Sequence, residues 1–337
     1  QPLDGRSAYA RRARPSNGRA DVMEHLGDRL ALLGYTAGWS AVRHLPEGVA
    51  YATFRRFADL AWRRRGPSVR RLEANLVRAI GSTDEAVVRE VSRHGMRSYL
   101  RYWCDAFRIP DWTKDRVVSR VQVVDEDNMR APLAEGRGVV AALPHMANWD
   151  HGGAWACLTG APVSTVAERL RPEKLFERFL AYREGLGMEI LPLTGATTDP
   201  FTTLAGRLRE PRLVPLLADR DLSRRGIDVR LFGELTRMPA GPAALALRTG
   251  AALVPTSLWY EGTEPDHRIV IRFHDEVMPP QHLRGAARVA WMTQAVADEF
   301  GPVITAHPHD WHMLQPLFLA DLASIDSRIG VTSETDR

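Results

Sequence analysis

The spacing of the apolar positions divides the chain into two parts. Up to about residue 120, apolar residues recur every three or four positions, which is the period of an amphipathic helix. From Val121 onward, short β-branched runs alternate with helix-like segments, a pattern typical of a sheet covered by helices. We therefore predict an α/β fold with a central, mostly parallel sheet, preceded by a helical N-terminal region.

The same pattern predicts the individual elements. In the first part, helices are expected at about 23–45, 49–65, 68–80, 83–107 and 112–120. In the second part, strands are expected at 121–125, 138–143, 163–167, 188–193, 213–218, 227–232, 252–260 and 268–274. Helices are expected there at 127–135, 149–158, 172–186, 200–209, 240–249 and 281–306. Ser82 and Glu85 form a capping box that would start the helix at 83–107.

The composition of the two ends sets the expected boundaries. Residues 1–22 contain five arginines without apolar periodicity and are interpreted as a disordered leader. Residues 23–120 are expected to be a helical region that forms one continuous domain with the α/β core at 121–325. Residues 326–337 are polar and are predicted to be a frayed tail.

One loop carries the residues most suited to catalysis. The buried strand at 138–143 stops at Pro144, and Asn148 is a suitable N-cap for the helix that follows. His145 then lies in the loop and Asp150 in the first helical turn, where the helix dipole favours its ionised form. An ionised Asp that faces a His can make the imidazole a general base. Among the eleven histidines, only His145 has an Asp at the fifth following position.

Bulk composition excludes several classes of protein. A chain of 337 residues with 45% hydrophobic and 26% charged residues is typical of a globular protein with a substantial core. Two cysteines, Cys104 and Cys157, exclude a disulfide framework and a cysteine-based zinc site, and fit a reducing cytosol. The apolar runs are too short for a transmembrane span, and no secretory signal is present.

The basic residues are almost all arginine. Lys114 and Lys174 are the only lysines among 45 basic residues, which indicates either a GC-rich genome or a surface that holds phosphate through bidentate guanidinium contacts. The helix at 49–65 places aromatic residues beside arginines, which suits a helix lying on an anionic membrane. A core-packed helix with a solvated face fits the same pattern. Nucleic-acid binding is not indicated, because acidic residues are interspersed among the basic ones.

Six stretches carry a resemblance to known enzymes: Leu-Pro-His145-Met-Ala-Asn-Trp-Asp150, Thr165-Val-Ala-Glu168-Arg169-Leu, Tyr182-Arg183-Glu-Gly-Leu-Gly, Ala218-Asp219-Arg220-Asp221-Leu, Arg237-Met-Pro-Ala-Gly-Pro242-Ala and Asp310-Trp-His-Met-Leu-Gln-Pro316. They resemble the glycerolipid acyltransferase superfamily with its H-x4-D motif, and more narrowly its lipid A biosynthesis branch. Within that branch the chain is most similar to the actinobacterial enzymes that acylate phosphatidylinositol mannosides. The likeness runs from about residue 30 to 325.

The resemblance implies an activity and a location. It implies a peripheral enzyme on the cytoplasmic face of the plasma membrane, which moves a fatty acyl group, often palmitoyl, from acyl-CoA to a mannose hydroxyl. The expected partners are acyl-CoA, a mannosylated phosphatidylinositol and an anionic membrane surface, with no separate cofactor and no metal. The resemblance further implies that His145 and Asp150 are catalytic and that Glu168 and Arg183 line the site. A related acyltransferase with another glycolipid or a lysophospholipid as acceptor is the alternative.

The chemistry requires a base, because an alcohol is too weak an acid to attack a thioester unaided. Neutral His145 would take the proton of the acceptor hydroxyl as its oxygen approaches the carbonyl carbon. Asp150 is expected to bind the other imidazole nitrogen and to fix the tautomer. The acceptor hydroxyl then plays the part of the serine in a triad, so no protein nucleophile is needed.

Asp219 is a third candidate for a catalytic role. It follows the strand at 213–218, at a carboxyl end where functional loops gather. It could hold the acceptor sugar or a second edge of His145, or it could form only a turn pair with Arg220. The chain departs here from the mycobacterial enzymes that it resembles, because they carry Glu, which is one methylene longer.

Three further residues are candidates for binding substrate. Arg183 could contact a phosphate of the acceptor or of CoA, or lie on a solvated helix face. Arg224 is a less specific phosphate candidate. Glu168 could line the site or form an ion pair with Arg169.

Other functions are less well supported by the residues. Cys157 could be a nucleophile, but it falls on an apolar helix face that favours a buried thiol. The histidines at 307, 309 and 312 invite a zinc site, although their spacing is not that of regular helical ligands. A catalytically silent lipid-binding protein is disfavoured by the intact pair of His145 and Asp150.

Overall fold

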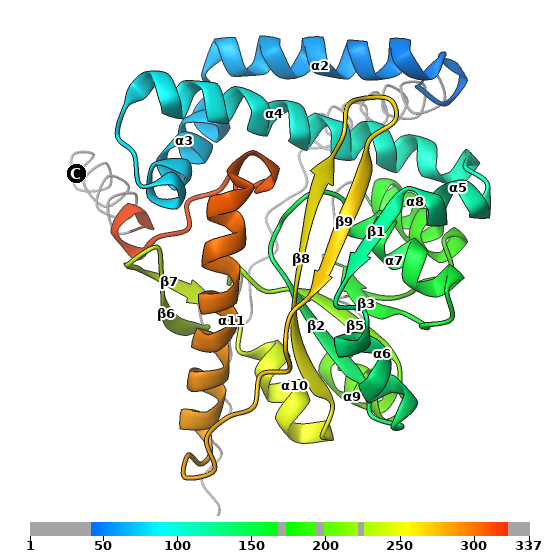
Figure 1. Cartoon of the computed structure of the whole chain (residues 1–337), viewed down its shortest axis with the longest axis vertical. Helices are drawn as coiled ribbons and strands as arrows, with labels where there is room; N and C mark the ends of the chain where they lie inside the picture. Colours follow the sequence, from blue (N-terminus) through cyan, green and yellow to red (C-terminus); the bar gives the residue numbers. More distant parts are fainter. Residues whose placement is uncertain (1–41, 168–172, 193–198, 222–225, 323–337) are drawn as a thin grey trace, which may run out of the picture.

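The computed structural model describes residues 42–167, 173–192, 199–221 and 226–322 (Figure 1). The predicted leader, the predicted tail and nearly all of the predicted helix at 23–45 lie outside these ranges. Three helices form the described N-terminal layer: α2 (Glu47–Arg64), α3 (Pro67–Ile80) and α4 (Glu85–Arg108). A short 3-10 turn, η1 (Ile109–Asp111), and the helix α5 (Lys114–Ser119) lead from this layer into the sheet.

Ion pairs and apolar contacts hold α2 against α4. Arg93 and Arg97, one helical turn apart on α4, both donate to the Asp59 carboxylate of α2, at 3.2 and 2.7 Å.

The helix α4 itself begins two residues later than predicted. Asp84 is its N-cap and accepts from the Ala86 N–H at 2.8 Å, whereas the Ser82 hydroxyl accepts from the Asp84 N–H. The predicted capping box is therefore wrong, because Asp84, which is as good an N-cap as Ser82, caps the helix two residues later.

The central sheet contains five strands in the order β1-β9-β8-β2-β5. These strands are β1 (Val121–Val124), β2 (Val139–Leu143), β5 (Leu213–Leu217), β8 (Ala252–Glu261) and β9 (Arg268–Phe273). β2 lies parallel to both β5 and β8, β1 lies parallel to β9, and only the β8–β9 pair of this sheet is antiparallel. The predicted α/β fold with a mostly parallel sheet is confirmed.

Two smaller strand pairs flank this sheet. β3 (Ser164–Ala167) and β4 (Glu189–Pro192) are parallel, and a bridge between Val163 and Leu213 connects them to β5. β6 (Ile227–Leu231) and β7 (Glu234–Met238) form an antiparallel hairpin. β7 was not predicted, because its two apolar residues, Leu235 and Met238, are three positions apart and give no strand-like alternation.

Helices cover both faces of the sheet, so every residue of β2 is buried. Val140 and Ala142 face a core formed with α9 (Pro200–Arg209), α10 (Gly241–Thr249) and α11 (Ala286–Ala306). The alternate residues of β2 face a second core formed with α6 (Asp127–Ala134) and α7 (Trp149–Leu158). Figure 1 shows α11 and α7 on opposite sides of the strands. The remaining helix, α8 (Glu173–Gly185), packs on β4.

The helical layer lies across the carboxyl end of β8, with α4 beneath α2 (Figure 1). Arg101 of α4 anchors this layer, since it pairs with Glu264 at 2.9 Å and stacks on the Tyr260 ring. Among the described helices, none has the length and apolarity needed to cross a bilayer.

Candidate active site

The loop after β2 holds His145 in a fixed position. The Asn148 side chain caps α7 by accepting from the His151 N–H at 3.0 Å, as predicted. The 3-10 turn η2 (Pro308–Asp310) and the residues after it bind the loop from the other side. The Ala147 N–H donates to the Asp310 carbonyl at 3.0 Å, and the His312 N–H donates to the His145 carbonyl at 2.7 Å. The loop backbone is therefore hydrogen-bonded to the C-terminal segment at His145 and at Ala147.

Asp219 lies beside His145 because their two strands are neighbours in register. β2 and β5 are parallel, with Leu143 paired to Leu217. His145 and Asp219 each follow two residues after that last pair, so they emerge together at the carboxyl edge. Oδ1 of Asp219 lies 2.5 Å from Nδ1 of His145, and Oδ2 accepts from the His145 backbone N–H at 2.9 Å.

The Asp219 carboxylate is fully buried and has three donors. Besides the two from His145, the indole N–H of Trp311 donates to Oδ2 at 2.9 Å. Burial by itself raises the pKa of this carboxyl, but the charge and hydrogen bonds of His145, together with the Trp311 bond, outweigh it and leave the pKa below its usual value. An ionised carboxylate only accepts hydrogen bonds, so the proton of a neutral His145 ring sits on Nδ1. Nε2 is then the nitrogen free to act as a base.

The predicted contact between His145 and Asp150 is wrong. Among the described residues Asp150 has no hydrogen bond to His145; its carboxylate binds Arg183 of α8, Nε to Oδ1, at 2.8 Å. It also accepts from the Tyr102 hydroxyl of α4 at 2.9 Å. The contact does not form because Asp219 already accepts from the backbone N–H and from Nδ1 of His145. The Asp150 carboxylate is buried and therefore needs a cation beside it, which Arg183 supplies.

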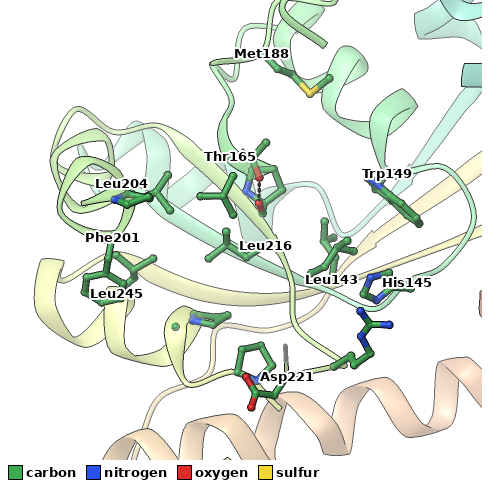
Figure 2. A pocket seen from close by; sticks show the side chains of 18 of the residues that line it. Leu143, His145, Trp149, Thr165, Met188, Phe201, Leu204, Leu216, Asp221 and Leu245 are labelled. Carbon is green, nitrogen blue, oxygen red and sulfur yellow. Dashed lines mark hydrogen bonds between the residues drawn. The ribbon is translucent and has the colours of Figure 1, made fainter. Parts of the chain in front are cut away.

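A cavity of about 390 Å³ opens beside His145, and Asp150 and Arg183 also line it. The remaining walls are mostly apolar, with contributions from Leu143, Trp149, Val166, Phe201, Leu204, Leu216 and Leu245. Figure 2 shows His145 near one end of the cavity and Phe201 with Leu245 far from it. The Trp149 ring meets His145 edge to face, with centroids 5.8 Å apart. A polar dyad at one end of a mostly apolar cavity suits chemistry at the head of a lipid chain.

The sequence matches the model of the bacterial lipid A biosynthesis acyltransferases over residues 19–320. The chain belongs to this family. It is similar to a protein named phosphatidylinositol mannoside acyltransferase from Mycolicibacterium smegmatis, at 45% identity over 298 residues that cover 88% of this chain and 94% of that relative. A protein of the same name from Mycobacterium tuberculosis is 45% identical over 291 residues, covering 86% and 89%. The chain is therefore an acyltransferase, as the sequence stretches predict.

The structure brings together four of the six predicted site residues of this acyltransferase. His145, Asp150 and Arg183 line the cavity, and Asp219 supports His145 from behind. The other two, Glu168 and Arg224, lie outside the described residues. Asp219 binds His145 rather than forming only a turn pair with Arg220, so the arm that is one methylene shorter than Glu still reaches the imidazole.

Two residues that donate to the carboxylates of the site were not predicted. Tyr102 was read only as part of a helix, and Trp311 only as part of the stretch at 310–316. Both are aromatic residues with a polar group, and such residues usually need a partner when buried. That rule is the one signal in the sequence that could have found them.

The groups considered as alternatives have other partners in the acyltransferase. Cys104 is buried, and the Cys157 thiol donates to the Gly187 carbonyl at 3.3 Å; burial raises the pKa of both thiols. The histidines of the C-terminal segment have different partners, since His307 stacks on Trp259 and the His312 ring contacts the Ser98 hydroxyl. No group of three or more metal-ligating side chains occurs in the part of the chain that the structure describes.

Proposed function

We propose that this acyltransferase moves a palmitoyl group from acyl-CoA to a mannose hydroxyl of a phosphatidylinositol mannoside, with His145 as the general base. The observation that carries the proposal is the contact of His145 with Asp219 beside a mostly apolar cavity. The name of the two mycobacterial relatives supports the acceptor. Each methylene of an acyl chain gains about 0.8 kcal/mol on leaving water, which supports a fatty donor for such a cavity.

The proton passes from the acceptor to the leaving group by way of His145. Nε2 takes the proton of the mannose hydroxyl while the oxygen attacks the thioester carbonyl. The ionised Asp219 stabilises the imidazolium that forms, and it receives no proton itself. When the tetrahedral intermediate collapses, the carbon–sulfur bond breaks and the imidazolium returns the proton to the CoA thiolate. The ester and free CoA balance the reaction without a further cofactor.

Arg183 and Arg220 supply positive charge for the phosphate groups of the substrates. Both line the cavity. Arg220 has no hydrogen bond or ion pair within the described ranges, so its guanidinium is available for a bidentate phosphate contact. In this proposal Asp150 is a positioning residue, because it holds Arg183 against the cavity wall with the help of Tyr102.

The outer face of α2 supports attachment to the cytoplasmic face of the plasma membrane. Phe57 and Leu60 are 56% and 45% exposed there. Arg56, Arg63 and Arg64 are exposed as well and have no acidic partner among the residues that the structure describes. The arginines of α4, in contrast, are largely paired with acids. Exposed apolar side chains next to free cations suit an anionic bilayer surface.

The test is a panel of lipid acceptors offered with radiolabelled palmitoyl-CoA. The proposal predicts label on phosphatidylinositol mannosides, with release of CoA that depends on the acceptor. Label found only on other glycolipids or on lysophospholipids would overturn the acceptor, and binding of acyl-CoA without any transfer would indicate a silent lipid-binding protein.

A further inference from the structure

The strands β3 and β5 lie next to each other but are joined at one point. In the described residues the only bridge between the two strands pairs Val163 with Leu213. At this bridge the Leu213 N–H donates to the Pro162 carbonyl at 3.0 Å. Beyond this bridge β3 pairs with β4, and β5 pairs with β2 along its whole length. The sheet is therefore split between β3 and β5 toward their carboxyl ends.

Pro215 accounts for this split. The backbone N–H and C=O groups of alternate residues face the same neighbouring strand. The backbone of Leu213 faces β3, whereas the Ala218 N–H donates to the Leu143 carbonyl of β2 at 2.7 Å. Odd-numbered residues of β5 therefore face β3 and even-numbered residues face β2. Pro215 is the next residue after Leu213 to face β3. A proline there has no N–H for the following rung. The Pro215 carbonyl instead accepts from the Thr165 hydroxyl at 2.6 Å, a side-chain contact in place of a ladder.

The cavity beside His145 opens at this split. Val166 of β3 and Pro215 of β5 line it from the two sides of the seam. Its walls also come from both faces of the sheet, since Met188 belongs to the core on the α7 side and Leu245 to the core on the α10 side. The cavity thus crosses the plane of the sheet instead of lying on one face.

We propose that Pro215 keeps the seam between β3 and β5 open, so that the acyl chain of the donor passes through the sheet to a floor formed by Phe201, Leu204 and Leu245. Figure 2 shows Leu216 between His145 and this floor, with Met188 in a different direction. This inference rests on the proposed acyl-CoA donor. It makes Pro215 a residue that determines the length of the acyl chain.

The first test replaces Pro215 by Val in the full chain and measures binding of hexadecyl-CoA and octyl-CoA, thioether analogues that cannot be cleaved. Val restores the backbone N–H and favours strand pairing. We expect at least ten-fold weaker binding of hexadecyl-CoA with little change for octyl-CoA, because a closed seam leaves two or more methylenes in water at about 0.8 kcal/mol each. Pro255→Val is the matched control, since Pro255 lies within β8 and does not line the cavity.

A second pair of variants tests the direction of the chain without altering the seam. Leu245→Trp fills the floor on the α10 side, and Met188→Phe fills the α7 side. We expect Leu245→Trp to move the preference among acyl-CoA donors to shorter chains, and Met188→Phe to leave it unchanged. A shift caused by Met188→Phe in place of Leu245→Trp would overturn the proposed path.

The outcomes separate this inference from the proposed function. Tight binding of hexadecyl-CoA by the native chain and by Pro215→Val alike would overturn the role of Pro215 and leave the donor intact. Failure of the native chain to bind either analogue would overturn the proposed donor, and the role of Pro215 with it.

Discussion

The imidazole of His145 is oriented by Asp219, which lies 74 residues further along the chain, with Nδ1 and Oδ1 2.5 Å apart. The two residues meet because β2 and β5 are parallel neighbours and each residue follows the same distance after the last pair. Asp150, five positions after His145, instead forms an ion pair with Arg183. The carboxylates of Asp219 and Asp150 therefore have different partners in this site. In the proposed mechanism Asp219 prepares His145 as the base, and Asp150 holds the Arg183 cation at the cavity wall.

Replacement of Asp150 by Asn should affect stability and substrate affinity more than the proton transfer. The substitution removes one partner of a buried ion pair, which typically costs about 3–5 kcal/mol in the free energy of unfolding. Chemical denaturation measures this loss, and steady-state kinetics should show a higher KM with a smaller change in kcat. An unchanged KM together with a kcat as low as that of His145→Ala would show that Asp150 acts on the base after all.

Replacement of His151 by Gln should weaken the acid sensitivity of folding. Burial lowers the pKa of His151 to about 4 from 6.5, although its hydrogen bond to the Val117 carbonyl opposes this. Between these values the unfolded chain binds a proton that the folded chain does not, so stability falls as the pH is lowered. The slope approaches about 1.4 kcal/mol per pH unit for this group.

The Gln side chain can still donate to Val117 but does not titrate. The plot of unfolding free energy against pH should therefore be shallower for His151→Gln by about one proton around pH 5, and parallel to that of the native chain above about pH 7.5. Plots that run parallel over the whole pH range would contradict the lowered pKa of His151 in the folded chain.

Replacement of Phe57 and Leu60 by Ser should weaken binding to anionic vesicles. Both side chains are exposed on the outer face of α2, and loss of their insertion should lower the partition coefficient by about ten-fold or more. Sedimentation with phosphatidylinositol-containing vesicles measures this. Leu235→Ser is a matched control, because Leu235 is also 45% exposed but lies on β7. Equal losses for both variants would show that α2 has no special role.

Most elements of the fold could be predicted because their periodicity is strong and their ends carry clear signals. The helix α7 begins at Trp149 and ends at Leu158, as predicted from the Asn148 cap. The order of the strands could not be predicted, since β2 pairs with β5 and β8, which are distant in the sequence. Local patterns contain no information on which strands become neighbours.

The same limitation explains the wrong partner of His145. The sequence placed both His145 and Asp219 just after strands, but it offered Asp150 as the nearer carboxylate. Only the register between Leu143 and Leu217 shows that Asp219 is the closer one in space. The Trp311 donor depends in turn on the C-terminal segment, which packs against the loop after β2.

The central claim is that Asp219 and His145 act as one unit in proton transfer. Acceptor-dependent release of CoA from palmitoyl-CoA, measured for His145→Ala, Asp219→Asn and the double variant, tests it most directly. We expect Asp219→Asn to lower kcat by about 10²–10⁴-fold, and the double variant to be no slower than His145→Ala alone. Turnover of Asp219→Asn at the native rate, or losses that simply add in the double variant, would contradict the account.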